Sequence, residues 1–235
     1  MKLALIGNGS MGQLVTTLAR DAGHEIGAVL ASRDADRTID DLAAQLSGHD
    51  AAIDFSVSGA ALRNIEACAA AQVPLVEGTT GWQNEEPRMR QIIAQHDGAL
   101  IYGANFSVGA NLFYRAVEHA ASLFAVAPEY SPFIEEAHHV KKRDAPSGTA
   151  LRLRDLLRRQ LKIEIPIAST RAGHIPGTHR VGFDSAADQI TLTHTARSRQ
   201  GFASGALVAA KWIVGRKGVY EFSEVIGELV GERKG

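Results

Sequence analysis

The sequence predicts an α/β protein in which a doubly wound parallel sheet is joined to a second domain of the α+β class. Over the first hundred residues, short apolar runs typical of buried strands alternate with segments in which apolar residues recur every three or four positions, as in helices packed on one face. After about Asn105 this alternation gives way to longer helices and several strand-like pieces. Strand–helix alternation favours a parallel sheet with helices on both faces.

The pattern assigns each part of the chain to an element. In the first part, strands are expected at residues 2–7, 24–31, 51–55, 73–76 and 99–102, with helices from Met11 to about Ala19, over 60–71 with Ser58 as a cap, and over about 85–96. Later helices are expected at 112–124, 149–161 and 201–214, and later strands at 132–140, 162–168, 179–183 and 189–196, before a short mixed tail at 218–230. We therefore expect one domain at residues 1–105, completed by about 204–235, and a second domain at 106–203.

The composition excludes several classes of protein. The 235 residues carry 25 Lys and Arg against 26 Asp and Glu, with a single cysteine. A nucleic-acid-binding protein would be basic overall or along one stripe, and a disulfide scaffold or a Cys-based zinc cluster needs more cysteines. The N-terminal apolar run is too short for a signal peptide, and no stretch reaches the roughly 18 apolar residues that span a bilayer. We expect a cytoplasmic protein with neither nucleic acid nor membrane as a partner.

The turn after the first expected strand reads Gly7-Asn8-Gly9-Ser10-Met11-Gly12, and an expected helix follows it. In a G-x-G-x-x-G turn, one glycine closes the turn, one lets the backbone approach a pyrophosphate, and one lets helix and strand pack closely. The anion lies at the helix N-terminus, where unpaired N–H groups and the helix dipole favour negative charge. The motif predicts dinucleotide binding in a Rossmann-type domain, and the alternative is a purely structural glycine turn.

The end of the second expected strand, Ala31-Ser32-Arg33, indicates which dinucleotide is preferred. NAD-specific sites usually carry Asp or Glu here, but this chain has no carboxylate before Asp34. A hydroxyl and a guanidinium suit a 2′-phosphate, so we expect NADPH as the preferred cofactor and NADH as a tolerated one. The alternative is that Ser32 and Arg33 are solvated turn residues.

Two further loops follow expected strands, namely Gly78-Thr79-Thr80-Gly81 and Gly103-Ala104-Asn105-Phe106-Ser107. Ligands of open α/β sheets bind at the carboxyl ends of the strands, so these residues are candidates to contact the ribose or the nicotinamide. Ordinary turn chemistry is the alternative for each loop.

The segment from Glu135 to Ala150 holds the densest group of chemically active side chains. It contains His138 and His139, three consecutive cations at 141–143, and a Ser-Gly-Thr sequence at the start of an expected helix. Ser147 or Thr149 is suited to cap this helix, whose free N–H groups would hold a carboxylate. Histidine titrates near neutrality, and a lysine beside other cations holds its proton less tightly. The segment therefore has the parts needed to bind a small anion and deliver a proton.

Three other interpretations of this segment compete. Adjacent histidines on a strand point to opposite faces and no third ligand is obvious, so we expect no metal site. A nucleic-acid patch would interleave aromatic residues with the cations. A solvated basic face is the remaining alternative.

The string Glu136-Ala137-His138-His139, with Lys142 and Asp144-Ala145-Pro146-Ser147-Gly148-Thr149-Ala150, closely resembles the signature of the dihydrodipicolinate reductases (4-hydroxy-tetrahydrodipicolinate reductases) of bacterial lysine and diaminopimelate biosynthesis. Segments at 51–56, 78–81, 104–109, 194–199 and 202–206 resemble the same family in the same order. The resemblance covers essentially the whole chain.

The resemblance implies a Rossmann domain that the C-terminal tail completes and a middle domain that binds substrate and mediates tetramerisation. Hydride would pass from NAD(P)H to a cyclic imine dicarboxylate and give tetrahydrodipicolinate. It implies that His138 is the proton donor or acceptor and that Lys142 is its partner acid. The resemblance places the substrate carboxylates against His139, Gly148 and Thr149, and we expect Ser147 to bind substrate with them. It places the cofactor against Gly7 to Gly12, Gly78 to Thr80 and Gly103 to Phe106.

Two features depart from the family pattern. The glycine loop is one residue shorter than in many members, and Ala31 stands where an acidic residue is common. Two other functions remain open, namely another two-domain NAD(P)-dependent oxidoreductase and an NADP-binding sensor without turnover. The presence of His138, Lys142 and Thr149 argues against both.

Overall fold

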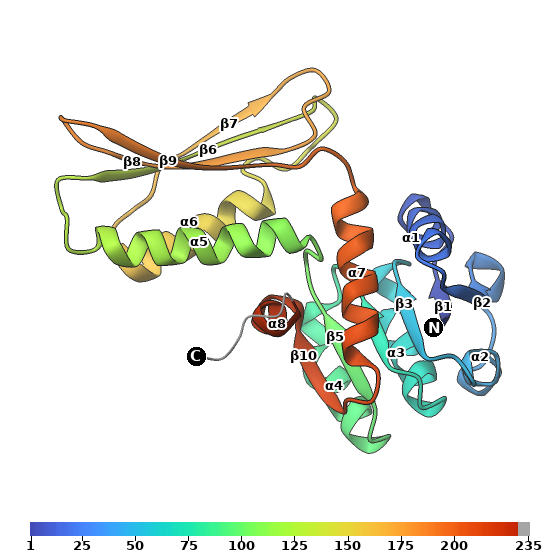
Figure 1. The fold of residues 1–235 in the computed structure, drawn as a ribbon. Helices are drawn as coiled ribbons and strands as arrows, with labels where there is room; N and C mark the ends of the chain where they lie inside the picture. The colour runs from blue at the N-terminus through green and yellow to red at the C-terminus, as the bar shows by residue number, and fades with distance from the viewer. Residues whose placement is uncertain (230–235) are drawn as a thin grey trace. The chain divides into compact units, whose positions relative to one another are not determined.

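The computed structural model, which describes residues 1–229, confirms the α/β class and contains two separate sheets (Figure 1). The chain divides into one unit that comprises Met1–Val108 and the chain from Gln200 onward, and a second unit, Gly109–Arg199. The boundaries, expected after residues 105 and 203, are found after 108 and 199, so that helix α7 (Gln200–Ile213) lies wholly in the first unit. Residues 230–235, the end of the segment expected to complete that unit, lie outside the described residues.

A six-stranded parallel sheet forms the centre of the first unit. Its order is β10-β5-β4-β3-β1-β2. The strands are β1 (Lys2–Ile6), β2 (Glu25–Leu30), β3 (Ala51–Asp54), β4 (Leu75–Glu77), β5 (Ala99–Tyr102) and β10 (Gly218–Glu221). The strand order reverses at β1, which pairs with β2 on one side and β3 on the other. Ligands of open α/β sheets bind at the carboxyl edge beside such a reversal.

Helices cover both faces of this sheet, as the doubly wound class requires (Figure 1). One face packs against α1 (Ser10–Asp21), α7 and α8 (Phe222–Leu229), and the other against α2 (Ile39–Leu46), α3 (Ala61–Ala70) and α4 (Glu86–Gln95). The side chains of β1 point alternately into the two hydrophobic cores, Leu3 and Leu5 into one and Ala4 and Ile6 into the other. Because a strand alternates its side chains, the apolar run at the N-terminus is buried on both faces.

The second unit is a four-stranded mixed sheet with two helices on one face (Figure 1). The order is β7-β6-β8-β9, where β6 (Ser131–His138) is parallel to β7 (Ile167–Arg171) and antiparallel to β8 (Thr178–Asp184). Strand β9 (Gln189–Thr195) is the other edge. Helices α5 (Val108–Phe124) and α6 (Gly148–Leu161) pack onto Ile134 and Val181 of the sheet.

Several expected elements differ from the structure. The strand expected at 162–168 begins only at Ile167, because Lys162 ends α6 in a left-handed conformation (φ 59°) and Pro166 lacks the N–H that a strand ladder uses. Ser58 begins a 3-10 turn, η2 (Ser58–Ala60), and α3 starts after it without a side-chain cap. The mixed tail forms β10 and α8, and helix α2 was not expected.

The packing of α7 on the first unit yields a stability prediction. An alanine Cβ at Gly205 in α7 would lie 1.6 Å from the carbonyl oxygen of Phe106. At Gly201 of the same helix, an added Cβ would meet only Ser107 Oγ, at 3.3 Å. Glycine to alanine in a helix is otherwise favourable by about 0.5–1 kcal/mol. We expect Gly205→Ala to lower the free energy of unfolding by about 1–3 kcal/mol, whereas Gly201→Ala leaves it nearly unchanged, as measured by denaturant titration. Equal stability of both variants would contradict this packing.

Candidate active site

The glycine turn of the first unit joins β1 to α1 at the reversal of strand order. Gly7 has a φ of +96°, and an added Cβ would lie 2.5 Å from the carbonyl oxygen of Phe55. A Cβ at Gly12 would lie 2.0 Å from the carbonyl oxygen of Gly7, whereas at Gly9 no atom lies within 4 Å of that position. The first glycine therefore closes the turn, the third allows helix and strand to pack closely, and the second leaves open space above the backbone.

The residues around this turn fit a pyrophosphate. Gly9 is the N-cap residue of α1 and has no side chain that could accept a capping hydrogen bond. The first turn, which includes Ser10, Met11 and Gly12, contains no acidic residue. Backbone N–H groups and the dipole at such a helix end attract an anion. Asn8 lies in the turn, where its carbonyl accepts a hydrogen bond from Gln13 Nε2 at 3.3 Å.

The end of β2 adjoins this turn, because the N–H of Gly7 donates to the carbonyl of Leu30 at 2.8 Å. Ser32 and Arg33 lie in the short turn η1 (Ser32–Asp34), and the Arg33 side chain is 71% exposed. The buried Asp34 carboxylate instead accepts a hydrogen bond from Ala31 N–H at 2.9 Å and pairs with Arg37 at 2.8 Å.

These contacts decide which charge the end of β2 presents. The hydrogen bond from Ala31 outweighs the effect of burial and, together with Arg37, lowers the pKa of Asp34. The carboxylate is thus ionised but turned toward its own backbone. The guanidinium of Arg33 donates to the carbonyl of Val29 at 3.0 Å and lies 3.6 Å from the Asp34 carboxylate, while most of the side chain remains open to solvent.

The loops after β4 and β5 are only partly accessible. Thr79 is buried, while its neighbours Gly78 and Thr80 are more open. After β5, Gly103, Ala104 and Asn105 are partly or fully exposed, but Phe106 is buried and packs its ring against Phe55 and Phe222. The Phe106 side chain is part of the core, so any contact with a cofactor falls to its backbone.

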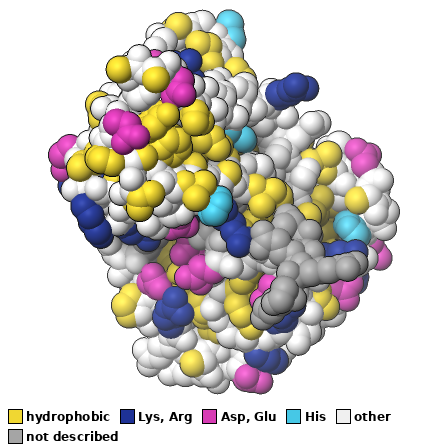
Figure 2. All heavy atoms as spheres, turned by 60° about the vertical axis from the view of Figure 1, so that its left-hand side comes forward, with side chains coloured by type: hydrophobic (Ala, Val, Ile, Leu, Met, Phe, Trp, Pro, Cys, Tyr) yellow, Lys and Arg dark blue, Asp and Glu magenta, His cyan; other side chains and the backbone are white. Residues whose placement is uncertain are grey.

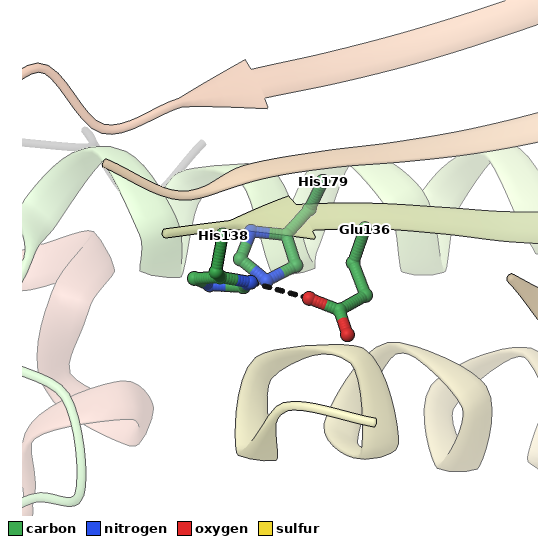
Figure 3. Close-up of side chains that lie close together, drawn as sticks. All are labelled: Glu136, His138 and His179. Carbon is green, nitrogen blue, oxygen red and sulfur yellow. Dashed lines mark hydrogen bonds and ion pairs between the residues drawn. The ribbon is translucent and has the colours of Figure 1, made fainter. Parts of the chain in front are cut away.

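A compact polar cluster lies in the second unit, at the end of β6. Glu136 and His138 are two residues apart on this strand and therefore share a face, and His179 on β8 pairs in register with Glu136. The three side chains point toward one another, as Figure 3 shows, and are 2%, 8% and 6% exposed, respectively. The rings of His138 and His179 meet edge to face with centroids 5.0 Å apart.

Glu136 is held ionised although it is buried. Its Oε2 pairs with Nδ1 of His138, and its Oε1 accepts from the Arg171 guanidinium at 2.7 Å. Burial alone would raise the pKa of Glu136, but hydrogen bonds from Arg171, Ser169 and His138 outweigh it and lower the pKa to about 2. A fixed negative charge therefore lies beside His138.

The two histidines are held in the neutral form. Burial lowers the pKa of His138 despite the opposing effect of Glu136, and the nearby Lys142 and Arg171 lower it further. Burial, followed by the positive charge of a protonated His138, lowers the pKa of His179 to about 4. His179 Nε2 lies 3.1 Å from the hydroxyl of Ser147, which ties the cluster to the start of α6.

The start of α6 and the loop before it hold the other expected site residues. Ser147, rather than Thr149, caps the helix, and its Oγ accepts from the N–H of Ala150 at 3.2 Å. Gly148 and Thr149 form the first turn, which has no acidic residue. Lys142 pairs with Asp144 at 2.8 Å. His139 follows β6, and its buried Nδ1 has no hydrogen-bonding partner among residues 1–229.

Glu136 belongs to the string that resembles the family, but local sequence does not bring Arg171 or His179 beside His138. Only Glu136 carries a local signal, since it stands two residues before His138 on one strand. Ligand atoms of Glu136, His138 and His179 lie within 4.8 Å of one another, a grouping that the local sequence around His138 and His139 does not reveal. The Arg171 cation already neutralises Glu136 and would oppose a metal ion there.

The surface gives no sign of a basic stripe on the face seen in Figure 2, where basic and acidic side chains are interspersed. Within residues 1–229, no helix combines the length and the apolar character needed to cross a bilayer.

Comparisons with known proteins agree with this arrangement. The family model described as "Dihydrodipicolinate reductase, N-terminus" matches residues 1–106, and the model described as "Dihydrodipicolinate reductase, C-terminus" matches residues 109–226. The 4-hydroxy-tetrahydrodipicolinate reductase of Christiangramia forsetii is 38% identical over 97% of this chain and 99% of the relative. That of Methanoregula boonei is 40% identical over 76% of this chain and 75% of the relative.

Solved structures share the fold. A dipicolinate-bound dihydrodipicolinate reductase from Paenisporosarcina sp. TG-14 matches with a TM-score of 0.81 at 23% identity, over 96% of this chain and 99% of that one. A probable dehydrogenase from Thermotoga maritima matches with a TM-score of 0.61 at 10% identity, over 98% of this chain and 94% of that one. With family models that span both units and a relative that is similar over nearly its full length, the chain belongs to the dihydrodipicolinate reductase family.

Proposed function

We propose that this chain reduces 4-hydroxy-tetrahydrodipicolinate to tetrahydrodipicolinate in lysine and diaminopimelate biosynthesis, with NADPH as the preferred reductant and NADH as a tolerated one. Its family membership supports the reaction, and the glycine turn of the first unit supports a pyridine nucleotide. The observation that carries the proposal is the buried pair of Glu136 and His138, which stands beside the Ser147-capped start of α6. The reaction consumes one hydride and one proton and releases water.

In this proposal, His138 supplies the proton through Nε2. Its Nδ1 is engaged by Glu136, so Nε2 is the nitrogen left to exchange a proton. Nε2 faces Gly177, where an added Cβ would lie 3.2 Å from it. A bound dicarboxylate brings negative charge close to the imidazole, and such charge raises the pKa of a histidine. The proton is then held best when substrate is present. The nicotinamide supplies the hydride when it is bound.

The substrate carboxylates are assigned to the cationic side of the same cluster. The donors are the side chains of His139, Lys142 and Ser147 and the first N–H groups of α6, at Gly148 and Thr149. The cap and the first turn of α6 contain no acidic side chain that would repel a carboxylate. Lys142 is the second acid of the proposal. Positive groups already fixed near the ring also stabilise charge that develops during reduction.

Oligomeric state and location complete the proposal. The sheet of the second unit ends in strands β7 and β9, which have no further strand partner among residues 1–229, and Ile190 on β9 is exposed. Edges of this kind favour pairing between copies, and we assign a homotetramer to the chain. Its one cysteine, Cys68, is buried and unpaired, in keeping with a cytoplasmic location.

The direct test of the proposal is a coupled assay with the upstream synthase that follows NADPH absorbance. We expect His138→Ala to lower kcat by about 10²- to 10⁴-fold, the usual contribution of a positioned general acid, and Lys142→Ala to lower it strongly as well. NADPH affinity is expected to stay near normal in both. His119→Ala, an exposed histidine of α5, serves as the control. Equal turnover in all variants would remove the proposed roles.

The role of Glu136 is tested by the pH profile of kcat/KM. The pKa of His138 is lowered in the free enzyme, so the protonated form is lost as pH rises through that lowered value. Glu136 opposes this shift, so Glu136→Gln moves the descending limb to still lower pH, with about a tenfold loss near neutral pH for each unit of pKa. Glu135→Gln, which removes only an exposed ion pair with Arg180, is the matched control. Superimposable profiles of wild type and Glu136→Gln would contradict the role.

The preference for NADPH is tested at the end of β2. We expect Arg33→Ala to raise the Kd for NADPH by about tenfold, the value of one lost charge-assisted hydrogen bond to phosphate, with little change for NADH. Arg20→Ala, an exposed arginine of α1, is the control. Binding is followed by nucleotide fluorescence. A lower KM for NADH than for NADPH that Arg33→Ala leaves unaltered would overturn the assignment.

A further inference from the structure

Two carboxyl groups of the first unit lie side by side in its interior. Asp54 ends β3 and Glu77 ends β4, and the two residues are paired in register on these neighbouring strands. Paired residues of adjacent strands project from the same face of the sheet. Both side chains are completely buried (0% exposed). Two ionised carboxylates in such a place would repel each other strongly and would each lose their hydration.

No cation relieves this repulsion among the residues that the structure describes. The groups that act on Glu77 are burial, the charge of Asp54 and the N–H and hydroxyl of Thr79. The other titratable groups packed around the pair are the buried thiol of Cys68 on α3, whose pKa is raised by burial and by both carboxyls, and Tyr102 on β5, whose hydroxyl donates to Glu86 at 3.4 Å. Neither can neutralise a carboxylate.

The hydrogen bonds are divided unequally between the two carboxyl groups. Asp54 accepts from Asn64 Nδ2 and from the N–H of Ser56, both at 2.7 Å, and from the Thr79 hydroxyl at 3.3 Å. Glu77 accepts from the N–H of Thr79 at 2.7 Å, and within residues 1–229 its buried Oε2 has no partner. Donors stabilise a carboxylate, so Asp54 is the better site for the negative charge and Glu77 for a proton. Burial and the charge of Asp54 both raise the pKa of Glu77 well above its usual range.

The same hydrogen bonds fasten two loops at the carboxyl edge of the sheet. Thr79 donates its N–H to Glu77 and its hydroxyl to Asp54, and the N–H of Ser56 reaches both Asp54 and the Thr79 hydroxyl. Trp82 adds a hydrogen bond from Nε1 to the Thr79 carbonyl at 2.8 Å. The pair therefore lies directly beneath the loop that begins at Gly78, which the proposed function assigns to the cofactor.

We propose that Asp54 and Glu77 share one proton at neutral pH and that this half-neutralised pair positions the loops of Ser56 and Thr79 for cofactor binding. The shared proton makes one carboxyl a donor to the other, which accounts for a buried carboxylate oxygen without a partner. When the proton is lost at alkaline pH, two buried charges face each other and the loops that they hold are loosened. The part of this inference that concerns the cofactor rests on the proposed function.

The shared proton is tested without any ligand. At neutral pH, we expect the infrared spectrum of the wild-type protein to contain the carbonyl band of a protonated carboxylic acid. The band should be absent in Glu77→Gln and retained in Glu85→Gln, a control in which an exposed carboxylate of the same loop region is removed. A wild-type spectrum without this band would overturn the proposal.

The stability of the protein gives a second, independent readout. A carboxyl group whose pKa is raised on folding binds more protons in the folded state, so stability is lost as pH rises from the unfolded pKa through the folded one. We expect Glu77→Gln to melt above wild type by a margin that widens as pH rises above the pKa that Glu77 has in the unfolded chain. Glu85→Gln should follow wild type throughout. A margin that does not change with pH would count against a titrating pair.

The positioning role is tested by the Kd for NADPH as a function of pH. We expect the wild-type Kd to rise on the alkaline side by about tenfold for each pH unit beyond the pKa of the pair, and the Kd of Glu77→Gln to rise much less. Parallel profiles would overturn the positioning role. Failure of the wild-type protein to bind NADPH at any pH would instead overturn the proposed function, while the infrared band and the melting margin would still decide whether the proton is shared.

Discussion

The parallel pairing of β1 with both β2 and β3 is the constraint on which the first unit depends. Because β1 is buried on both faces, polar groups can appear only where strands end. The backbone fastens the exits of the strands to one another through the pairs Gly7 N–H to Leu30, Phe55 N–H to Ile6, Gly78 N–H to Asp54 and Gly103 N–H to Glu77. Gly7 lies too close to the Phe55 carbonyl for any side chain. The packing of the sheet alone therefore requires glycine at position 7, whether or not a ligand binds. The open space at Gly9 is the feature that a purely structural turn would not need.

In the second unit, burial and fixed charge act together on the imidazoles. Glu136 loses hydration when it is buried, and the donors on Arg171, Ser169 and His138 compensate for that loss. Burial keeps His138 and His179 neutral, and the nearby cations Lys142 and Arg171 lower the pKa of His138 further. Glu136 is paired with Arg171 and Asp144 with Lys142, and the cluster lies beside the start of a helix that has no acidic residue in its first turn. An anion bound beside this cluster would raise the pKa of His138.

The sequence predicts the features that depend on local spacing. The buried strands of the first unit, the glycine turn and the helices with a strong apolar period follow from neighbouring residues, and the structure has each of them. Local sequence also offers Ser147 or Thr149 as the cap of α6, and the structure has Ser147. Helix α2 is only eight residues long, and its start depends on the cap that Thr38 makes with Asp41, so its periodic signal is weak. Arg171 and His179 join Glu136 only through the pairing of β6 with β7 and β8, and Phe106 is drawn into the core by Phe55 and Phe222. Such contacts between distant segments leave no mark on local periodicity.

The two units neutralise a buried carboxyl group in different ways, and strand order explains why. Arg171 belongs to β7, an edge strand, so its guanidinium reaches Glu136 while the side chain remains partly exposed. Asp54 and Glu77 end β3 and β4, which are interior strands under the core of α3 and α4, where a guanidinium would have to be buried completely. A shared proton neutralises one of the two buried carboxylates without the space that an arginine side chain would take up. Arginine keeps its charge at any pH that the protein tolerates, whereas a shared proton can be lost. Sensitivity to alkaline pH therefore belongs to the interior of the parallel sheet rather than to the ion pair at the edge of the mixed one.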